Sequence, residues 1–346
     1  MSFAFGHVHI PYPSDRRTEA LFGWFGEYLA VNEEGRHLRL YRCPGVENGN
    51  SEPDAVEVGY FGPQPCQAMT FPLRLAHDRT KEIAFLTDEG DLRRYALTYN
   101  NPPHLIEERL ADGGLCLAYS QQMDMLAVGG RGGELTIHAI GGHAGGSRVV
   151  RHVSDSDILQ VGFIESGILV ARDAAARVWV LTGLHLRDGR FNARAVCVQS
   201  LHDLSFGLSD DVEAYAMDVQ PHGHQVLVAG KGSRGYMVKL DSEAAEAREG
   251  ETPREQVRVA AIQLVSSNLT GGYVRYAHFL SNNRFVLGDR NSLEVFNQGQ
   301  EGTCKRCDGW DFGSDHTVIA CRAHANQRLY LLTAPFPVPL TAEVIE

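Results

Sequence analysis

The chain has 346 residues, of which 43% are hydrophobic and 22% charged, and it carries a net charge of −11. This length accommodates one large all-β domain or two ordinary domains. The acidic balance argues against nucleic acid as the main target, because general affinity for nucleic acid requires a basic field. No apolar run approaches the roughly 18 residues that a membrane span needs.

The N-terminal residues and the cysteine content both indicate the cellular compartment. The first residues lack a basic start followed by an apolar core, so we expect no signal peptide. The seven cysteines are odd in number and mostly scattered, which favours a reducing compartment over a disulfide framework. We therefore expect an intracellular protein, in the cytoplasm or the nucleus, without membrane insertion.

Seven short apolar runs recur along the chain, and each is followed by a tight polar or Gly-rich turn and a second, often alternating run. Each such pair of runs predicts a β-hairpin. The hairpins cover residues 28–41, 83–97, 125–139, 168–181, 226–240, 284–296 and 317–332. Most have a further β-rich run before them and many have another after them, which predicts four strands per unit.

The spacing of the hairpins predicts the architecture. Counted from Val31 in the first to Ile319 in the seventh, it averages about 48 residues, near the period of propeller repeats. Seven such units with almost no helical periodicity predict an all-β fold. We expect one domain over residues 1–346, a seven-bladed β-propeller with four antiparallel strands per blade. A terminal strand closes the ring, with Phe3–Ile10 favoured over Val338–Ile345 because it alternates more cleanly.

The repeat is least regular near its end. Residues 297–310 (NQGQEGTCKRCDGW) make a poor outer strand, and the seventh hairpin arrives early, about 32 residues after the sixth. Two longer polar segments, residues 44–55 and 241–255, each follow a predicted third strand. We interpret both as solvated insertions on one rim of the propeller.

The period and strand pattern resemble those of the WD40-like propeller superfamily over nearly the whole chain. The diagnostic dipeptides are out of place or missing: Gly-His pairs do not precede a first strand, and Trp310-Asp311 falls before the seventh hairpin. Arg177–Val180 (RVWV) is nearest to the third-strand signature of the family. Kelch and other propeller classes remain open, and the resemblance assigns no functional residue.

The stretch Gly230–Gly235 (GKGSRG) matches the G-x-G-x-x-G fingerprint of dinucleotide-binding proteins. That fingerprint needs a helix after the glycines, whereas residues 236–240 (YMVKL) predict a strand. We therefore interpret it as a hairpin turn with positive φ at some positions. No other nucleotide or catalytic motif is present, and we predict no cofactor and no catalytic residue.

Charges recur at the turns between second and third strands, which must project from one face. The third, fifth, sixth and seventh units carry Arg131, Lys231, Arg290 and Arg322 there, which we call the basic arc. The fourth unit has Arg172 one place earlier, and the first two units carry acids. A like-signed arc predicts docking of an acidic surface or segment of a partner protein. Ordinary solvated turn charges would give the same pattern, so both interpretations stay open.

Two aromatic residues and four potential metal ligands complete the candidates. Trp24 and Trp310 lie near the starts of adjacent units, where they either pack between blades or act as binding anchors. Two pairs with a two-residue gap suggest either a structural zinc site or unconnected thiols: Cys304 with Cys307, and Cys321 with His324.

These features predict a non-catalytic scaffold, a rigid propeller subunit of a larger intracellular assembly that binds proteins through its loop faces. The alternative is a metal-dependent, lactonase-like propeller hydrolase with a site at the central channel. Its oxygen ligands would come from loops between blades, and the candidates are Asp155, Asp157, Asp210, Asp211, Asn268 and Asp311.

Overall fold

The computed structural model contains seven four-stranded antiparallel sheets and one two-stranded sheet. It describes residues 5–9, 21–25, 28–33, 37–42, 56–61, 68–70, 81–87, 89–97, 104–109, 113–120, 122–140, 148–164, 167–184, 186–187, 190–191, 196–204, 214–220, 223–244, 255–269, 272–281, 283–289, 291–299, 303–312, 316–323, 329–335 and 341–345. The chain is all-β in this part, apart from the one-turn helix α1 (Leu201–Leu204) and a 3₁₀ turn at Arg131–Gly133. No helix in the described ranges is long and apolar enough to cross a bilayer.

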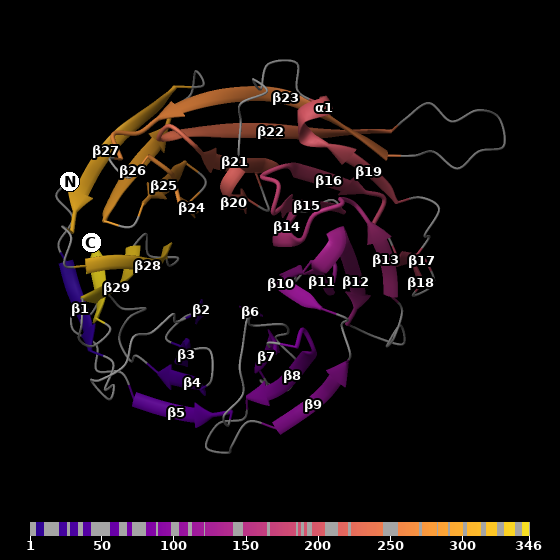
Figure 1. The fold of residues 1–346 in the computed structure, drawn as a ribbon, viewed down its shortest axis with the longest axis horizontal. Coiled ribbons are helices and arrows are strands. Elements are labelled where there is room, and N and C mark those ends of the chain that lie inside the picture. Colours follow the sequence, from indigo (N-terminus) through magenta and orange to yellow (C-terminus); the bar gives the residue numbers. More distant parts are fainter. Residues whose placement is uncertain are drawn as a thin grey trace.

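We number the four-stranded sheets from first to seventh in the chain order of their first strands. The first strand of each sheet is its innermost strand (Figure 1). The first strands are β2 (Leu21–Phe25), β6 (Ala68–Thr70), β10 (Gly114–Ser120), β14 (Ile158–Ile164), β20 (Ala214–Gln220), β24 (Tyr276–Ser281) and β28 (His316–Ala323). The second strands are β3 (Tyr28–Glu33), β7 (Lys81–Leu86), β11 (Met125–Gly130), β15 (Ile168–Asp173), β21 (Gln225–Gly230), β25 (Arg284–Gly288) and β29 (Leu329–Pro335).

The third and fourth strands complete each sheet toward its outer edge. The third strands are β4 (His37–Arg42), β8 (Leu92–Leu97), β12 (Glu134–Ala139), β16 (Val178–Thr182), β22 (Arg234–Ala244), β26 (Ser292–Gln298) and β30 (Thr341–Ile345). The fourth strands are β5 (Val56–Tyr60), β9 (His104–Arg109), β13 (Arg148–His152), β19 (Cys197–Ser200), β23 (Glu255–Ser266), β27 (Cys304–Asp311) and β1 (Phe5–His9). The short pair β17 (Leu186–Arg187) and β18 (Arg190–Phe191) forms the two-stranded sheet.

The sheets follow one another around a ring, with first strands toward the centre and fourth strands outside (Figure 1). Each first strand contacts the first strand of the next sheet, and β28 of the seventh sheet contacts β2 of the first. Both candidate terminal strands lie in the seventh sheet: β1 pairs with β30, from Phe5 opposite Ile345 to His9 opposite Thr341. The favoured N-terminal segment is therefore the outer strand, and the C-terminal segment is the third strand beside it.

The apolar core lies between neighbouring sheets, which explains why the second strands read as continuous apolar runs. All six residues of β11 are buried, because the strand packs against a sheet on each side. Between the third and fourth sheets the approach is close: a Cβ on Gly129 would lie 2.5 Å from Ile158 Cγ2 and 2.6 Å from Cys116 Sγ. Only glycine fits there without displacing the neighbouring sheet.

Three expectations about the strands are corrected. The seventh hairpin, residues 317–332, consists of first strand β28 and second strand β29, so the anchor at Ile319 was one strand early and the interval looked short. The supposedly poor outer strand contains β27, which pairs along its length with β26. Part of the segment 241–255 extends β22 and β23 into a long two-stranded ribbon, and Leu240 and Val257 of these strands share an apolar cluster with Leu201 of α1.

Candidate partner-binding face

One end of the ring carries the second-to-third-strand turns together with the loops that enter each next sheet, because successive strands in a sheet reverse direction. We call this end the turn face. Hydrogen bonds join its parts from one sheet to the next. The Gly132 amide donates to Asp157 Oδ1 at 2.8 Å, and the Ala174 amide donates to the Asp157 carbonyl at 2.7 Å.

The same linkage continues around the ring. The Ala214 amide donates to the Ala176 carbonyl at 3.0 Å, which joins the turn of the fourth sheet to the start of β20. The Gly232 amide donates to the Gly272 carbonyl at 3.0 Å, which joins the turn of the fifth sheet to the segment that enters β24. From the third sheet to the sixth, the turn face is therefore a continuous hydrogen-bonded surface rather than a set of separate loops.

The turns of the third and fifth sheets share one backbone design. Gly132 and Gly133 have φ values of 59° and 77°, and Gly232 and Ser233 have φ values of 73° and 55°. Two successive residues in the left-handed region give a tight turn that suits the twist of a hairpin. The interpretation of GKGSRG as a hairpin turn is confirmed, since the strand β22 follows it.

Two members of the basic arc lie on this surface. Arg131 and Lys231 occupy matching positions in the two turns, and both are exposed. Among the residues that the structure describes, neither side chain has an ion-pair or hydrogen-bond partner. Arg290 lies outside the described residues.

Two other basic residues are placed differently from the prediction. Arg322 is near the end of β28, a first strand, so it belongs to the rim opposite the turn face; the one-strand shift of the seventh hairpin is the cause. Arg172 lies within β15, where its Nε donates to Gln160 Oε1 at 2.6 Å and its Nη1 to the Ala214 carbonyl at 3.2 Å. Burial lowers the pKa of Arg172, which is a bonded part of the sheet rather than a turn charge.

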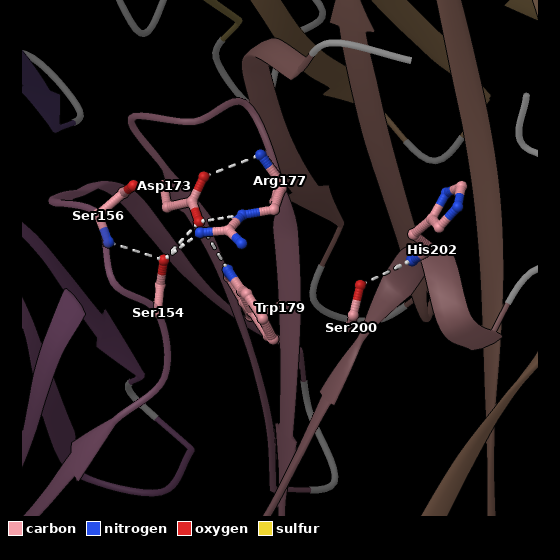
Figure 2. Close-up of polar contacts among 7 residues, drawn as sticks. All are labelled: Ser154, Ser156, Asp173, Arg177, Trp179, Ser200 and His202. Atoms are coloured by element: carbon pink, nitrogen blue, oxygen red, sulfur yellow. Dashed lines mark hydrogen bonds and ion pairs between the residues drawn. The ribbon is translucent and has the colours of Figure 1, made fainter. Parts of the chain in front are cut away.

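The fourth sheet uses its turn position for a buried carboxylate instead (Figure 2). Asp173 is fully buried and accepts hydrogen bonds from Ser154 Oγ at 2.6 Å and from Trp179 Nε1 at 3.0 Å. The backbone amide and the Nε of Arg177 each donate to it at 2.9 Å. Burial alone would raise the pKa of Asp173, but these hydrogen bonds outweigh it and hold the pKa below its usual value.

The network joins three parts of the turn face. Ser154 comes from the loop that enters the fourth sheet, Asp173 ends β15, and Trp179 lies on β16. The guanidinium of Arg177 also lies over the Trp179 ring, 5.3 Å from its centroid. Arg177 is thus the cation of this turn, whereas the sequence analysis assigned that place to Arg172. The signal in the sequence was that Arg177 follows the turn aspartate Asp173 by four residues.

Sequence reasoning missed an exposed aromatic pair on the turn face. Tyr215 and Tyr273 are 40% and 44% exposed, and their rings meet edge to face with centroids 5.2 Å apart. Tyr215 sits at a bulge near the start of β20, and Tyr273 forms an isolated β-bridge with Lys231. Tyr215 resembled any strand residue in the sequence, and only the fold brings it to Tyr273.

The two predicted tryptophans lie within sheets. Trp24 is on β2, where it pairs with Leu29 of β3; its side chain is outside the description. Trp310 is on the outermost strand β27, where it is half-buried against a cluster that includes Val286 and Leu293. Its surroundings favour the packing interpretation over a place at the channel mouth.

The four potential zinc ligands are only partly described. Cys304 and Cys307 both lie on β27, and Gln263 Nε2 donates to Cys304 Sγ at 2.7 Å. Burial raises the pKa of Cys304 to about 11 and also raises that of Cys307. Cys321 is on β28 without a described side chain, and His324 lies outside the description. The zinc site stays an untested prediction.

The oxygen ligands of the hydrolase hypothesis are spread over the molecule. Asp157 is committed to the Gly132 amide, Asn268 is exposed after the fourth strand β23, and Asp311 ends the outermost strand β27. Asp210 and Asp211 lie outside the described residues. Among the residues that the structure describes, no group of three or more His, Cys, Asp or Glu side chains could hold a metal ion.

Comparison with known proteins concerns the fold. No protein-family model and no curated protein sequence matches the chain. Among solved structures, Sqt1 from Chaetomium thermophilum is similar over 92% of this chain and 80% of its own, with a TM-score of 0.63 and 11% identity. A structure of Chaetomium thermophilum Sqt1 bound to the N-terminus of the ribosomal protein L10 is similar over the same shares, with a TM-score of 0.62 and 11% identity.

These likenesses favour a β-propeller, since Sqt1 has a WD40 propeller fold. In all, 1139 chains of solved structures match significantly. So common a fold hosts many functions, and at 11% identity the likeness is one of fold alone.

Proposed function

We propose that the chain is a single-domain, seven-bladed, WD40-like β-propeller that serves as a non-catalytic protein-interaction subunit of a larger intracellular assembly, in the cytoplasm. Its ring is closed by the N-terminal strand β1 beside β30. It takes one or more proteins as partners through the turn face, and nucleic acid is not its main target.

One observation carries this proposal: Arg131 and Lys231 project from matching turns of a continuous hydrogen-bonded surface, and neither has an acidic partner among the described residues. A rigid surface binds with little ordering cost, because its backbone is already held in place. Exposed cations that are not paired internally attract an acidic surface and speed its encounter. The partner chemistry that fits this face is therefore an acidic protein surface or segment.

The likeness to Sqt1 supports the class of partner. Its structure with the N-terminus of the ribosomal protein L10 shows a propeller of similar fold that holds a segment of another protein. A chain segment is small enough to follow one arc of turns, which suits a face whose exposed cations come from separate sheets, Arg131 from the third and Lys231 from the fifth.

Affinity purification from the native cell tests the proposal. The tagged protein is compared with the double variant Arg131→Glu/Lys231→Glu, and mass spectrometry identifies the proteins that co-purify in stoichiometric amounts. The matched control is Lys239→Glu/Lys305→Glu, which reverses two exposed charges away from the turn face. We expect a partner with the wild type and the control and its loss from the turn-face variant at unchanged melting temperature.

Two results would count against the proposal. A partner that all three proteins retain equally would move the interface away from the turn face. The absence of any stoichiometric partner, together with a hydrolytic activity that depends on Asp155 or Asp157, would favour the enzyme alternative.

A further inference from the structure

The Tyr215–Tyr273 pair is unusual for the surface on which it lies. Both rings are at least 40% exposed, although aromatic side chains of this size bury well in a core. Their edge-to-face contact holds each ring in place, so a partner would meet a preorganised apolar ridge. Exposed aromatic rings of this kind are enriched at protein interfaces, where they act as anchors.

A further exposed apolar side chain occupies the matching position of the neighbouring sheet. In β20 a bulge follows Ala214, and Tyr215 is the extra residue there. The same bulge in β14 places Leu159 at the matching position, and its side chain is 40% exposed. First strands β14, β20 and β24 contact one another in series toward the centre of the ring (Figure 1). Leu159, Tyr215 and Tyr273 therefore come from three consecutive sheets on the same face.

Positive charge flanks the ridge at its far side. Lys231 is bridged to Tyr273 through the backbone, and Arg275 is exposed two residues further along the chain. Neither side chain has an ion pair or hydrogen bond with any part of the chain that the structure describes.

Two described carboxylates of the sixth sheet are held by other groups and do not neutralise these cations. Asp289 is buried and accepts hydrogen bonds from the amides of Asn291 and Ser292. Glu294 is buried and bonds Arg306 and the Asn268 amide. Asp289 and Glu294 thus accept hydrogen bonds from groups of the sheet itself, whereas Lys231 and Arg275 are exposed to a ligand.

We propose that Tyr215, Tyr273, Lys231 and Arg275 form a docking site for an acidic protein segment that carries an aromatic or large aliphatic anchor residue. The anchor packs on the tyrosine ridge, and carboxylates on either side of it pair with Lys231 and Arg275. This inference rests on the proposed function and specifies the chemistry of its partner.

The surroundings favour an acidic segment over single-stranded nucleic acid. Stacking platforms for nucleic acid stand in a positively charged groove that follows several phosphates. Exposed acids lie further along the face, Asp155 in the loop that enters the fourth sheet and Glu134 at the start of β12 in the third, and the whole chain carries a net charge of −11. A repeating phosphate chain would be repelled there, whereas a short acidic segment would end before it.

Selection from a displayed random peptide library tests the site. The full-length protein is the bait, and enriched peptides are synthesised and measured by fluorescence anisotropy. We expect enrichment of acidic peptides with an aromatic or large aliphatic residue. Lys231→Glu and Tyr273→Ser should each weaken their binding by about tenfold or more, since one such contact is worth about 1.4 kcal/mol.

Matched substitutions elsewhere on the chain serve as controls. Lys239→Glu changes a lysine at the other end of the same hairpin, and Tyr60→Ser removes a 42% exposed tyrosine on the outer strand β5. Both should bind the peptides as the wild type does. Changing the acidic residues of an enriched peptide to Ser, or its anchor to Ser, should each abolish most of the affinity.

Three outcomes would overturn the inference. These are enrichment of basic peptides or of none, enriched peptides that bind Lys231→Glu and Tyr273→Ser as tightly as wild type, and tighter binding of a single-stranded oligouridine than of any peptide. The proposed function fails separately. If a native partner stays bound to Lys231→Glu and Tyr273→Ser, this docking site is wrong while the interaction scaffold stands.

Discussion

The turns of the fourth and fifth sheets occupy the same structural position and are built in opposite ways. In the fourth, the buried carboxylate of Asp173 gathers donors from Ser154, Trp179 and Arg177. In the fifth, Gly230 stands where Asp173 does, Gly232 and Ser233 have positive φ angles, and the turn backbone is hydrogen-bonded to neighbouring segments. In the turn of the fourth sheet the charged side chains bond each other and stabilise the fold. In the turn of the fifth sheet Lys231 is exposed.

The comparison shows that charge at a turn does not by itself mark a binding position. Arg177 and Lys231 are both exposed cations of the turn face, but Arg177 is tied to Asp173 by a 2.9 Å ion pair and also donates to Ser154. Releasing Arg177 to a partner would cost these bonds, whereas Lys231 has none to lose. The two turns therefore predict different consequences for stability and for binding.

The largest effect is expected from Asp173→Ala. It removes the acceptor of four hydrogen bonds and leaves the Trp179 Nε1 and Ser154 Oγ donors without their partner. We expect a loss of about 3 kcal/mol in the free energy of unfolding, because orphaned buried donors cost more than the bonds themselves contribute. Urea denaturation followed by tryptophan fluorescence measures it, and a loss below about 1 kcal/mol would show that the network is dispensable.

The ionisation of Asp173 gives this network a pH dependence. Its pKa is lowered in the folded protein, so its stabilising contribution is fully present above the unfolded pKa, about 4, and is lost as pH falls through the folded pKa. We expect the stability difference between wild type and Asp173→Asn to shrink below about pH 4. A difference that stays constant down to acid denaturation would contradict the charged state inferred here.

A smaller effect separates two glycines of matching turns. Gly133 has φ of +77°, and a Cβ there would overlap the Ser154 carbonyl, whereas at Gly232, with φ of +73°, a Cβ meets nothing within 4 Å. We expect Gly133→Ala to cost more than about 2 kcal/mol and Gly232→Ala about 1 kcal/mol, the cost of the backbone conformation alone. Equal losses in urea denaturation would show that the contact with Ser154 adjusts.

The strand pattern was predictable because buried strands and hairpin turns leave local signals. Six of the seven hairpins fall on second and third strands, and the turn at GKGSRG was interpreted correctly. The seventh was misplaced because residues 317–332 are as apolar as a second-to-third-strand pair, although they form a first and a second strand. Hydrophobic pattern alone cannot say which strand of a sheet a run becomes, and Arg322 went to the wrong rim for that reason.

The sequence pattern predicted only two of the residues in the candidate site. Arg131 and Lys231 were found because they follow an apolar anchor at a fixed distance. Tyr215 and Tyr273 were not found, because they are 58 positions apart in the numbering and meet only when β20 and the entry to β24 lie side by side. Contacts between sheets depend on how neighbouring sheets pack against each other, which no local pattern encodes.

The smallest expected effect on stability is the most informative about function. Lys231→Ala removes an exposed side chain that has no ion-pair partner in the described part of the chain, so the free energy of unfolding should change by less than about 0.5 kcal/mol. Arg177→Ala, its counterpart in the fourth sheet, removes the bonds to Asp173 and Ser154 and should cost about 1 to 2 kcal/mol.

Peptide binding should be weakened more by Lys231→Ala than by Arg177→Ala. The charge of Arg177 is paired with Asp173, whereas Lys231 is exposed to an acidic partner. Melting curves and anisotropy on the same preparations measure both properties. If Arg177→Ala weakened peptide binding more than Lys231→Ala did at matched folding, the turn of the fourth sheet would be the docking position. The buried carboxylate would then serve to orient Arg177 toward the partner rather than to withhold it.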